Sequence, residues 1–137
     1  MQSTTDYLAF AEAHGHKVYD MVLKENQSFC VEEDGECFIA MNKNQSDLSY
    51  KEHLLHELGH CEYGGFYNYH SPYDVRSRAE NKANRWAYIH ALPIDKVQEA
   101  IKSGCEEVWQ IAEYFDLPPE FVAEGLKFYV EQLGLRI

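Results

Sequence analysis

The amino-acid sequence predicts one α+β domain, and three observations support this fold class. Residues 48–63 and 75–92 each carry apolar positions at helical spacing. Before them, two β-prone runs flank Asp34-Gly35, which is the strongest short-range signal for a β-hairpin. From residue 94 onward the pattern is helical again. We therefore expect two long helices packed beside a small antiparallel sheet, followed by a helical C-terminal tail.

Length and composition agree with a single domain. The chain has 137 residues, of which 45% are hydrophobic and 26% charged, as in a globular protein. We expect residues 1–47 to form an N-terminal helix and hairpin, residues 48–93 the two long helices, and residues 94–137 the tail. The start carries no basic segment, and no apolar run is long enough to span a bilayer. These features predict a cytoplasmic location without a membrane partner.

Charge and cysteine content limit the partners and the redox chemistry. The formal net charge is −11, and the 12 Lys and Arg residues are scattered. Direct nucleic-acid binding is therefore not expected, whereas a basic protein partner would suit the acidic surface. The four cysteines have the spacing of neither a disulfide scaffold nor a Cys-x-x-Cys metal site, so we expect reduced, mostly buried thiols. They are Cys30, Cys37, Cys61 and Cys105.

The first 47 residues predict the small elements of the domain. Residues 4–14 favour a short helix ended by Gly15, and residues 18–23 a weak strand. The hairpin strands are expected at 28–33 and 36–41. An exposed edge of such a sheet can accept an extended peptide as an additional strand.

The helix predicted at 48–63 contains His56-Glu57-Leu58-Gly59-His60, a His-Glu-x-x-His pattern. Four residues are slightly more than one helical turn, so His56 and His60 project from the same face. Two neutral imidazoles held in this way offer adjacent corners of a tetrahedral zinc site, and Glu57 can reach a water molecule on the same ion. The pattern is typical of a zinc hydrolase. The alternative is a surface helix with two solvated histidines.

His53 lies on roughly the same face, but it is about 10 Å from His60 along the helix axis. That distance is too long for both to bind one ion, so we expect His53 at the rim of the site. The loop at 64–74 is rich in aromatic residues and should pass near the metal. Four of its residues are candidates for polarising a substrate carbonyl, or else for packing and lining a groove. They are Tyr67, Tyr69, His70 and Tyr73.

The second long helix, predicted at 75–92 and ended by Pro93, offers the third ligand. Glu80 shares a helical face with small residues, which would let this helix approach another backbone closely. The shared face comprises Ala83, Asn84, Ala87 and Ala91, while Trp86 and Ile89 fall on the other side. A metal ion would compensate a carboxylate buried in such a crevice. Glu80 is therefore the expected third ligand, with an exposed helix charge or a salt bridge as the alternative.

Other ligand schemes fit less well. A His-Glu-x-x-His-x-x-Gly-x-x-His pattern needs glycine and histidine where the chain has Tyr63 and Phe66. His90 is the second candidate for the third ligand. In the tail, residues 94–101 predict a short helix, and residues 108–133 a helix, a tight turn and a second helix. Because the last helix carries mostly acidic residues, packing or substrate docking is a better interpretation of this outline than DNA binding.

Together, the two motifs resemble the ImmA/IrrE-type zinc metallopeptidases of phages, mobile elements and bacterial stress-response systems. One matching segment is residues 56–60. The other, residues 80–93, is similar to the Glu-x-x-Ala-Asn-x-Phe-Ala…Leu-x-Pro segment of that family. The chain departs from the family pattern at Trp86, where the family usually has Phe, and at Ala91-Leu92-Pro93, a shortened form of its usual ending.

The resemblance implies a minimal zincin-like domain with Zn²⁺ bound by His56, His60 and Glu80, and with Glu57 as general base. It also implies a cytoplasmic anti-repressor protease that cleaves a helix-turn-helix repressor. Two other hypotheses stay open from the sequence. One is a zinc-stabilised interaction module that relieves repression by binding the repressor without cutting it, and the other is a toxin–antitoxin accessory domain. A His₂Glu ligand set also accepts divalent metals other than zinc.

Overall fold

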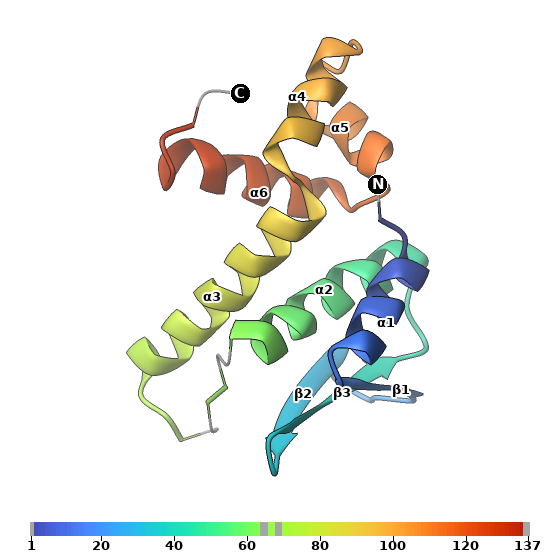
Figure 1. The fold of residues 1–137 in the computed structure, drawn as a ribbon, viewed down its shortest axis with the longest axis vertical. Coiled ribbons are helices and arrows are strands. Elements are labelled where there is room, and N and C mark those ends of the chain that lie inside the picture. The colour runs from blue at the N-terminus through green and yellow to red at the C-terminus, as the bar shows by residue number, and fades with distance from the viewer. Residues whose placement is uncertain (1, 64–65, 68–69, 136–137) are drawn as a thin grey trace.

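The computed structural model describes residues 2–63, 66–67 and 70–135 of the chain (Figure 1). The described residues confirm the α+β class, with six helices, three strands and a helical C-terminal region. In chain order the elements are α1 (Thr4–Ala13), β1 (Lys17–Met21), β2 (Ser28–Glu33), β3 (Glu36–Asn42), α2 (Asp47–Tyr63), α3 (Tyr73–Ala91), α4 (Ile94–Lys102), α5 (Val108–Phe115) and α6 (Pro119–Glu131). Within these residues, no helix combines the length and the apolar character needed to cross a bilayer.

The sheet has the strand order β1-β3-β2 and is mixed rather than antiparallel throughout. The predicted hairpin is confirmed: β2 pairs antiparallel with β3, and its two turn residues, Asp34 and Gly35, have φ of 54° and 79°. The first strand differs from the prediction because β1 pairs parallel with β3. The chain reverses direction once between β1 and β2 and again at the hairpin, so β3 runs in the same direction as β1.

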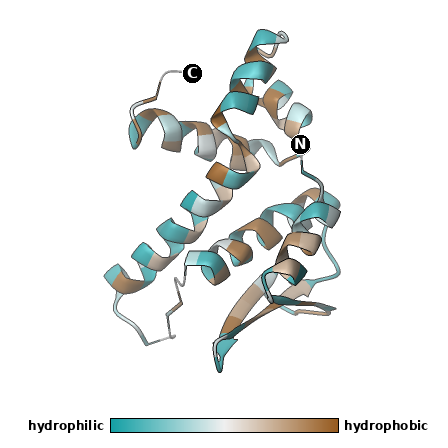
Figure 2. Ribbon diagram, viewed as in Figure 1, coloured by the Kyte–Doolittle hydropathy of each residue, from teal (hydrophilic) through white to brown (hydrophobic). Residues whose placement is uncertain are grey.

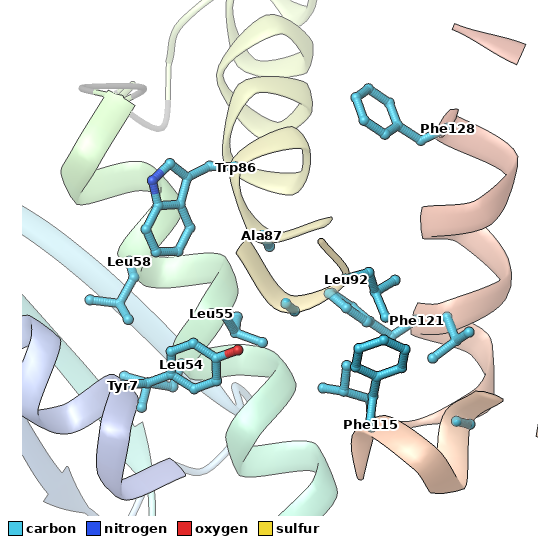
Figure 3. Packing of buried hydrophobic residues seen from close by; sticks show 14 of the residues in the cluster. Tyr7, Leu54, Leu55, Leu58, Trp86, Ala87, Leu92, Phe115, Phe121 and Phe128 are labelled. Atoms are coloured by element: carbon cyan, nitrogen blue, oxygen red, sulfur yellow. The ribbon is translucent and has the colours of Figure 1, made fainter. Parts of the chain in front are cut away.

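Helix α2 is the centre of the domain. It lies between the sheet and α3 in Figure 1, with α1 beside it and α4–α6 beyond the end of α3. Its residues Leu54, Leu55 and Leu58 are fully buried, as are Ile39 and Met41 of the central strand β3. Figure 2 shows bands of apolar residues repeated along α2 and α6, and Figure 3 shows the α2 leucines beside Trp86 and the aromatic residues of the tail. This packing fixes α2 on several sides.

Helix α3 is buried on more than its alanine face. Ala83, Ala87 and Ala91 are buried as predicted. Trp86, expected on the opposite side, is only 3% exposed, because its ring lies 5.6 Å from that of Phe10 in α1. The tail closes against the end of α3, where the Tyr129 hydroxyl donates to the Leu92 carbonyl oxygen at 2.6 Å. Packing therefore holds α3 from Ala79 to its C-terminal end, and it holds α2 from Lys51 onward.

The prediction of reduced thiols is wrong for Cys37 and Cys61, which form a disulfide between β3 and α2. These residues are 24 positions apart in the sequence, but the packing of α2 on the sheet brings their Cα atoms to 5.8 Å. The other two cysteines, Cys30 and Cys105, are not disulfide-bonded and are partly buried. The pairing depends on long-range packing, which cysteine spacing alone does not reveal.

Candidate metal centre

The His-Glu-x-x-His pattern lies in the C-terminal half of α2, and the helix brings both histidines to one side. His56 Nε2 and His60 Nε2 lie 3.2 Å apart. The His60 side chain is 6% exposed and the His56 side chain 25%, so the two nitrogens meet at the edge of the protein interior. This is the geometry that the four-residue spacing predicts.

Glu80 reaches the same point from α3. Its Oε2 lies 2.8 Å from His56 Nε2, and its Oε1 lies 3.3 Å from His60 Nε2. Two nitrogen or oxygen ligands of one tetrahedral zinc ion lie about 3.3 Å apart, since each bond is about 2.0–2.1 Å long. The three side chains therefore fit a small divalent ion with little movement. Their carboxylate and imidazole donors are also the types that zinc accepts.

Two further residues orient these candidate ligands. His56 Nδ1 donates to Asn84 Oδ1 at 2.8 Å, and this hydrogen bond orients the ring so that Nε2 faces Glu80 and His60. The Tyr67 hydroxyl donates to Glu80 Oε1 at 2.6 Å. Asn84 lies four residues after Glu80 on α3, so both project from the same face. The position of Asn84 on that face was visible in the sequence, but its hydrogen bond was not predicted.

The electrostatics of the site favour an ionised Glu80. Burial tends to raise the pKa of its carboxyl group, but hydrogen bonds from His56, His60 and Tyr67 outweigh burial and hold that pKa well below its usual range. Burial tends to lower the pKa of His56, but the Glu80 hydrogen bond and the Glu57 charge outweigh it and raise that pKa. The hydrogen bond to Glu80 raises the pKa of Tyr67 to about 12. A cation is therefore favoured beside this carboxylate.

Glu57 is buried and points toward the sheet, where the Ser28 hydroxyl of β2 donates to its Oε2 at 2.6 Å. One carboxylate oxygen of Glu57 lies within 4.8 Å of ligand atoms of both His56 and His60. Next to it, burial and the Glu57 charge raise the pKa of the Cys30 thiol. Ser28 and Cys30 were not predicted at the site, because their position depends on the packing of α2 against β2. A carboxylate at this distance can exchange a proton with a water molecule between it and the histidines.

The two long helices approach each other most closely at Gly59. A Cβ atom at this position would lie 2.8 Å from Ala83 Cα and 2.9 Å from the Ala83 carbonyl carbon. Real side chains do not tolerate such contacts with a backbone. The close approach expected from the small residues of α3 is confirmed, and Gly59 is its counterpart on α2. This contact places the Glu80 carboxylate within reach of both histidines.

A cavity of about 450 Å³ opens over these residues. Besides the four motif side chains it is lined by Ser28 and Phe29 of β2, by His53, and by Phe66 and Tyr67 of the loop between α2 and α3. His53 therefore lies at the rim, as expected. The cavity is continuous with the edge strand of the sheet, so the candidate ligands are accessible to a bound chain.

Among the loop candidates that the structure describes, Tyr67 lines the cavity and contacts Glu80. Tyr73 begins α3 and is 77% exposed, and His70 is also exposed. Tyr69 lies outside the described residues. His90, the second candidate for the third ligand, stacks on Trp86 at a ring separation of 4.0 Å and donates from Nδ1 to the Trp86 carbonyl. It is therefore held away from the His56 and His60 pair.

A comparison with models of known protein families shows to which family the chain belongs. Residues 11–127 match the model of the IrrE N-terminal-like domain, peptidase family M78. The chain belongs to the IrrE N-terminal-like domain family. This confirms the resemblance found in the two motifs and supports a metallopeptidase-type function. Neither the curated proteins nor the solved structures gave a match.

Proposed function

We propose that this IrrE-like domain is a zinc-dependent endopeptidase with His56, His60 and Glu80 as metal ligands and Glu57 as general base. The observation that carries the proposal is the convergence of these groups from two helices. The candidate ligand atoms lie 2.8–3.3 Å from one another, and a buried carboxylate stands beside them. Membership of a peptidase family supports peptide-bond hydrolysis as the reaction at this site.

The roles of the protein groups follow from their positions. His56, His60 and Glu80 would hold the zinc ion, which would supply Lewis-acid chemistry by lowering the pKa of a water molecule to about 7 and polarising a peptide carbonyl. Glu57 takes the proton of the attacking water on its carboxylate and delivers it to the leaving amine. The Ser28 hydroxyl donates to Glu57 Oε2 and so orients this carboxylate. The Tyr67 hydroxyl donates its one proton to Glu80 Oε1; turned from there toward the substrate, it would stabilise the oxyanion that develops on the carbonyl.

The substrate is proposed to be an extended segment of a protein. Strand β2 is an edge of the sheet, and its Phe29 and Val31 are 41% and 48% exposed. Phe29 also lines the cavity, so a peptide that adds to this edge as a strand would pass over the ligands. The net charge of −11 favours a basic partner. A helix-turn-helix repressor of a phage or mobile element, cleaved in the cytoplasm, fits these requirements and the family resemblance.

Metal analysis combined with a cleavage assay tests the proposal. The purified chain and its Glu57→Gln variant are each incubated with the repressor encoded beside the gene, and metal content and fragments are measured. We expect zinc in both proteins and discrete fragments from the wild type alone. If both proteins bind zinc and the repressor but neither cuts it, the zinc-stabilised binding module replaces the peptidase.

A further inference from the structure

A second group of potential metal ligands lies on a different side of α2 from the candidate peptidase site. Cys61 follows His60 directly, and one helical residue turns its side chain about 100° around the axis. There it meets Cys37 of β3 and His16 of the segment before β1, and one potential ligand atom from each residue lies within 4.8 Å of the others. The group therefore joins three segments that are distant in the sequence.

We propose that, when the Cys37–Cys61 disulfide is reduced, His16, Cys37 and Cys61 bind a second zinc ion. Two sulfur ligands of one tetrahedral zinc ion lie about 3.8 Å apart, since each zinc–sulfur bond is about 2.3 Å long. The Cα atoms of the two cysteines are 5.8 Å apart and already close enough for a covalent bond between the side chains. A modest rotation of each side chain opens the pair around an ion without moving the backbone.

The surroundings of His16 are those of a zinc-bound histidine. Its Nε2 lies 2.8 Å from Glu62 Oε2, and the other oxygen of Glu62 lies 2.9 Å from His14 Nδ1. Histidine ligands of zinc usually donate their second ring nitrogen to a carboxylate, which orients the ring. Glu62 therefore acts as a positioning residue for His16. Cys37 is 5% exposed and the His16 side chain 11%, so the site is largely shielded from water.

The disulfide and the metal site are two states of the same cysteine pair. Reduction by two molecules of a monothiol, which are oxidised to their own disulfide, converts the bond into two thiols. Binding of the divalent ion to the two thiolates then releases their two protons. In either state α2 is fastened to β3, and only the metal state also includes His16. The inference does not depend on the peptidase proposal, because it uses none of the residues of that site.

Cobalt titration of the reduced full-length chain tests the proposal. Thiolate ligands give Co²⁺ an intense sulfur-to-metal charge-transfer absorption, which a His₂Glu site lacks, so the two sites are distinguished in one protein. We expect two equivalents of Co²⁺ and a charge-transfer band that added Zn²⁺ removes. The oxidised chain should bind one equivalent without the band. One equivalent and no band in the reduced chain would overturn the proposal, and this measurement requires no variant.

Four variants assign the site. Cys37→Ser should remove the band and one equivalent, while Cys105→Ser, which changes a cysteine outside the group, should keep both. Glu80→Ala should lose the other equivalent and keep the band, so failure at either site is recognised separately. Glu62→Gln should keep the band and weaken cobalt binding about 10–100-fold. A band that survives Cys37→Ser in a folded protein would show that the thiolate belongs elsewhere and would refute the assignment.

Discussion

The two sides of α2 near its C-terminus carry different kinds of ligand group. The side toward α3 presents nitrogen and oxygen donors, all from two adjacent helices, and it opens into a cavity. The side toward β3 presents two sulfur atoms and one imidazole from three separate segments, and it is mostly enclosed. Accessible nitrogen and oxygen ligands suit a reactive zinc ion, whereas a shielded site with thiolates suits a zinc ion that crosslinks the fold.

The largest effect is expected from Glu57→Gln, which separates catalysis at the candidate peptidase site from metal binding at that site. Glu57→Gln keeps the size of the side chain and its contact with Ser28, but it removes the group that accepts the proton. We expect peptidase activity to fall about 10²–10⁴-fold while zinc content stays unchanged. Fragment yield and metal analysis are the measurements. The control is Glu113→Gln, which makes the same charge change at an exposed position of α5. Full activity of Glu57→Gln would exclude Glu57 as the general base.

Gly59→Ala tests whether the close approach of α2 and α3 positions Glu80 beside His56 and His60. The added methyl group meets the backbone of Ala83, which cannot rotate away, so α3 must shift and carry Glu80 with it. We expect a loss of about 2–4 kcal/mol in the free energy of unfolding and weaker zinc binding. Chemical denaturation and a zinc competition titration measure the two effects.

Gly125→Ala in α6 is the matched control. There the added methyl group would lie 2.6 Å from Leu92 Cδ1 and 3.3 Å from Tyr88 Cδ1, so the nearest atoms that it meets are side-chain atoms and not backbone. Both changes introduce alanine into a helix, so helix propensity favours both equally. We expect Gly125→Ala to cost less than Gly59→Ala and to leave zinc binding unchanged. Equal losses in both variants would contradict the role given to the Gly59 contact.

The difference between the two sides of α2 also explains how much of the site could be predicted from the sequence. His56, His60 and Glu80 lie on helices whose periodicity fixes which side chains share a face, so their grouping was predicted. Ser28 and the Cys37–Cys61 pair were not, because strand and helix meet there through long-range packing that no local spacing encodes. The parallel pairing of β1 was missed for the same reason. Trp86 was placed correctly on its helix face, but the α1 residue that covers that face could not be identified.

Asn84→Ala separates ligand orientation from ligation. The variant removes the acceptor for His56 Nδ1, so the ring can rotate and both of its tautomers become available. We expect zinc affinity to fall about 10–100-fold while the stoichiometry is retained. Competition with a chelating dye measures the affinity, and Asn81→Ala, at an exposed position of the same helix, is the control. An unchanged affinity in Asn84→Ala would show that packing alone orients His56.

Lys51→Met should lower the free energy of unfolding without changing metal binding at either of the two candidate sites on α2. Lys51 Nζ donates to the Phe115 and Asp116 carbonyl oxygens at 3.0 Å, joining α2 to the tail. Removing the donor should cost about 1–3 kcal/mol at neutral pH and leave metal binding intact. Lys82→Met, at an exposed position of α3, controls for the loss of charge.

Comparing the unfolding free energies of wild type and Lys51→Met at several pH values shows whether burial raises or lowers the pKa of Lys51. Burial lowers the pKa of the Lys51 ammonium from its ordinary value of 10.5, against the opposing charge of Asp116. Between the folded and unfolded pKa values the unfolded chain binds more protons, so wild-type stability rises with pH in that window. We therefore expect the difference in unfolding free energy between wild type and Lys51→Met to grow as pH approaches 10.5. A difference that shrinks over this range would mean that the two carbonyl contacts favour the charged amine more than burial disfavours it.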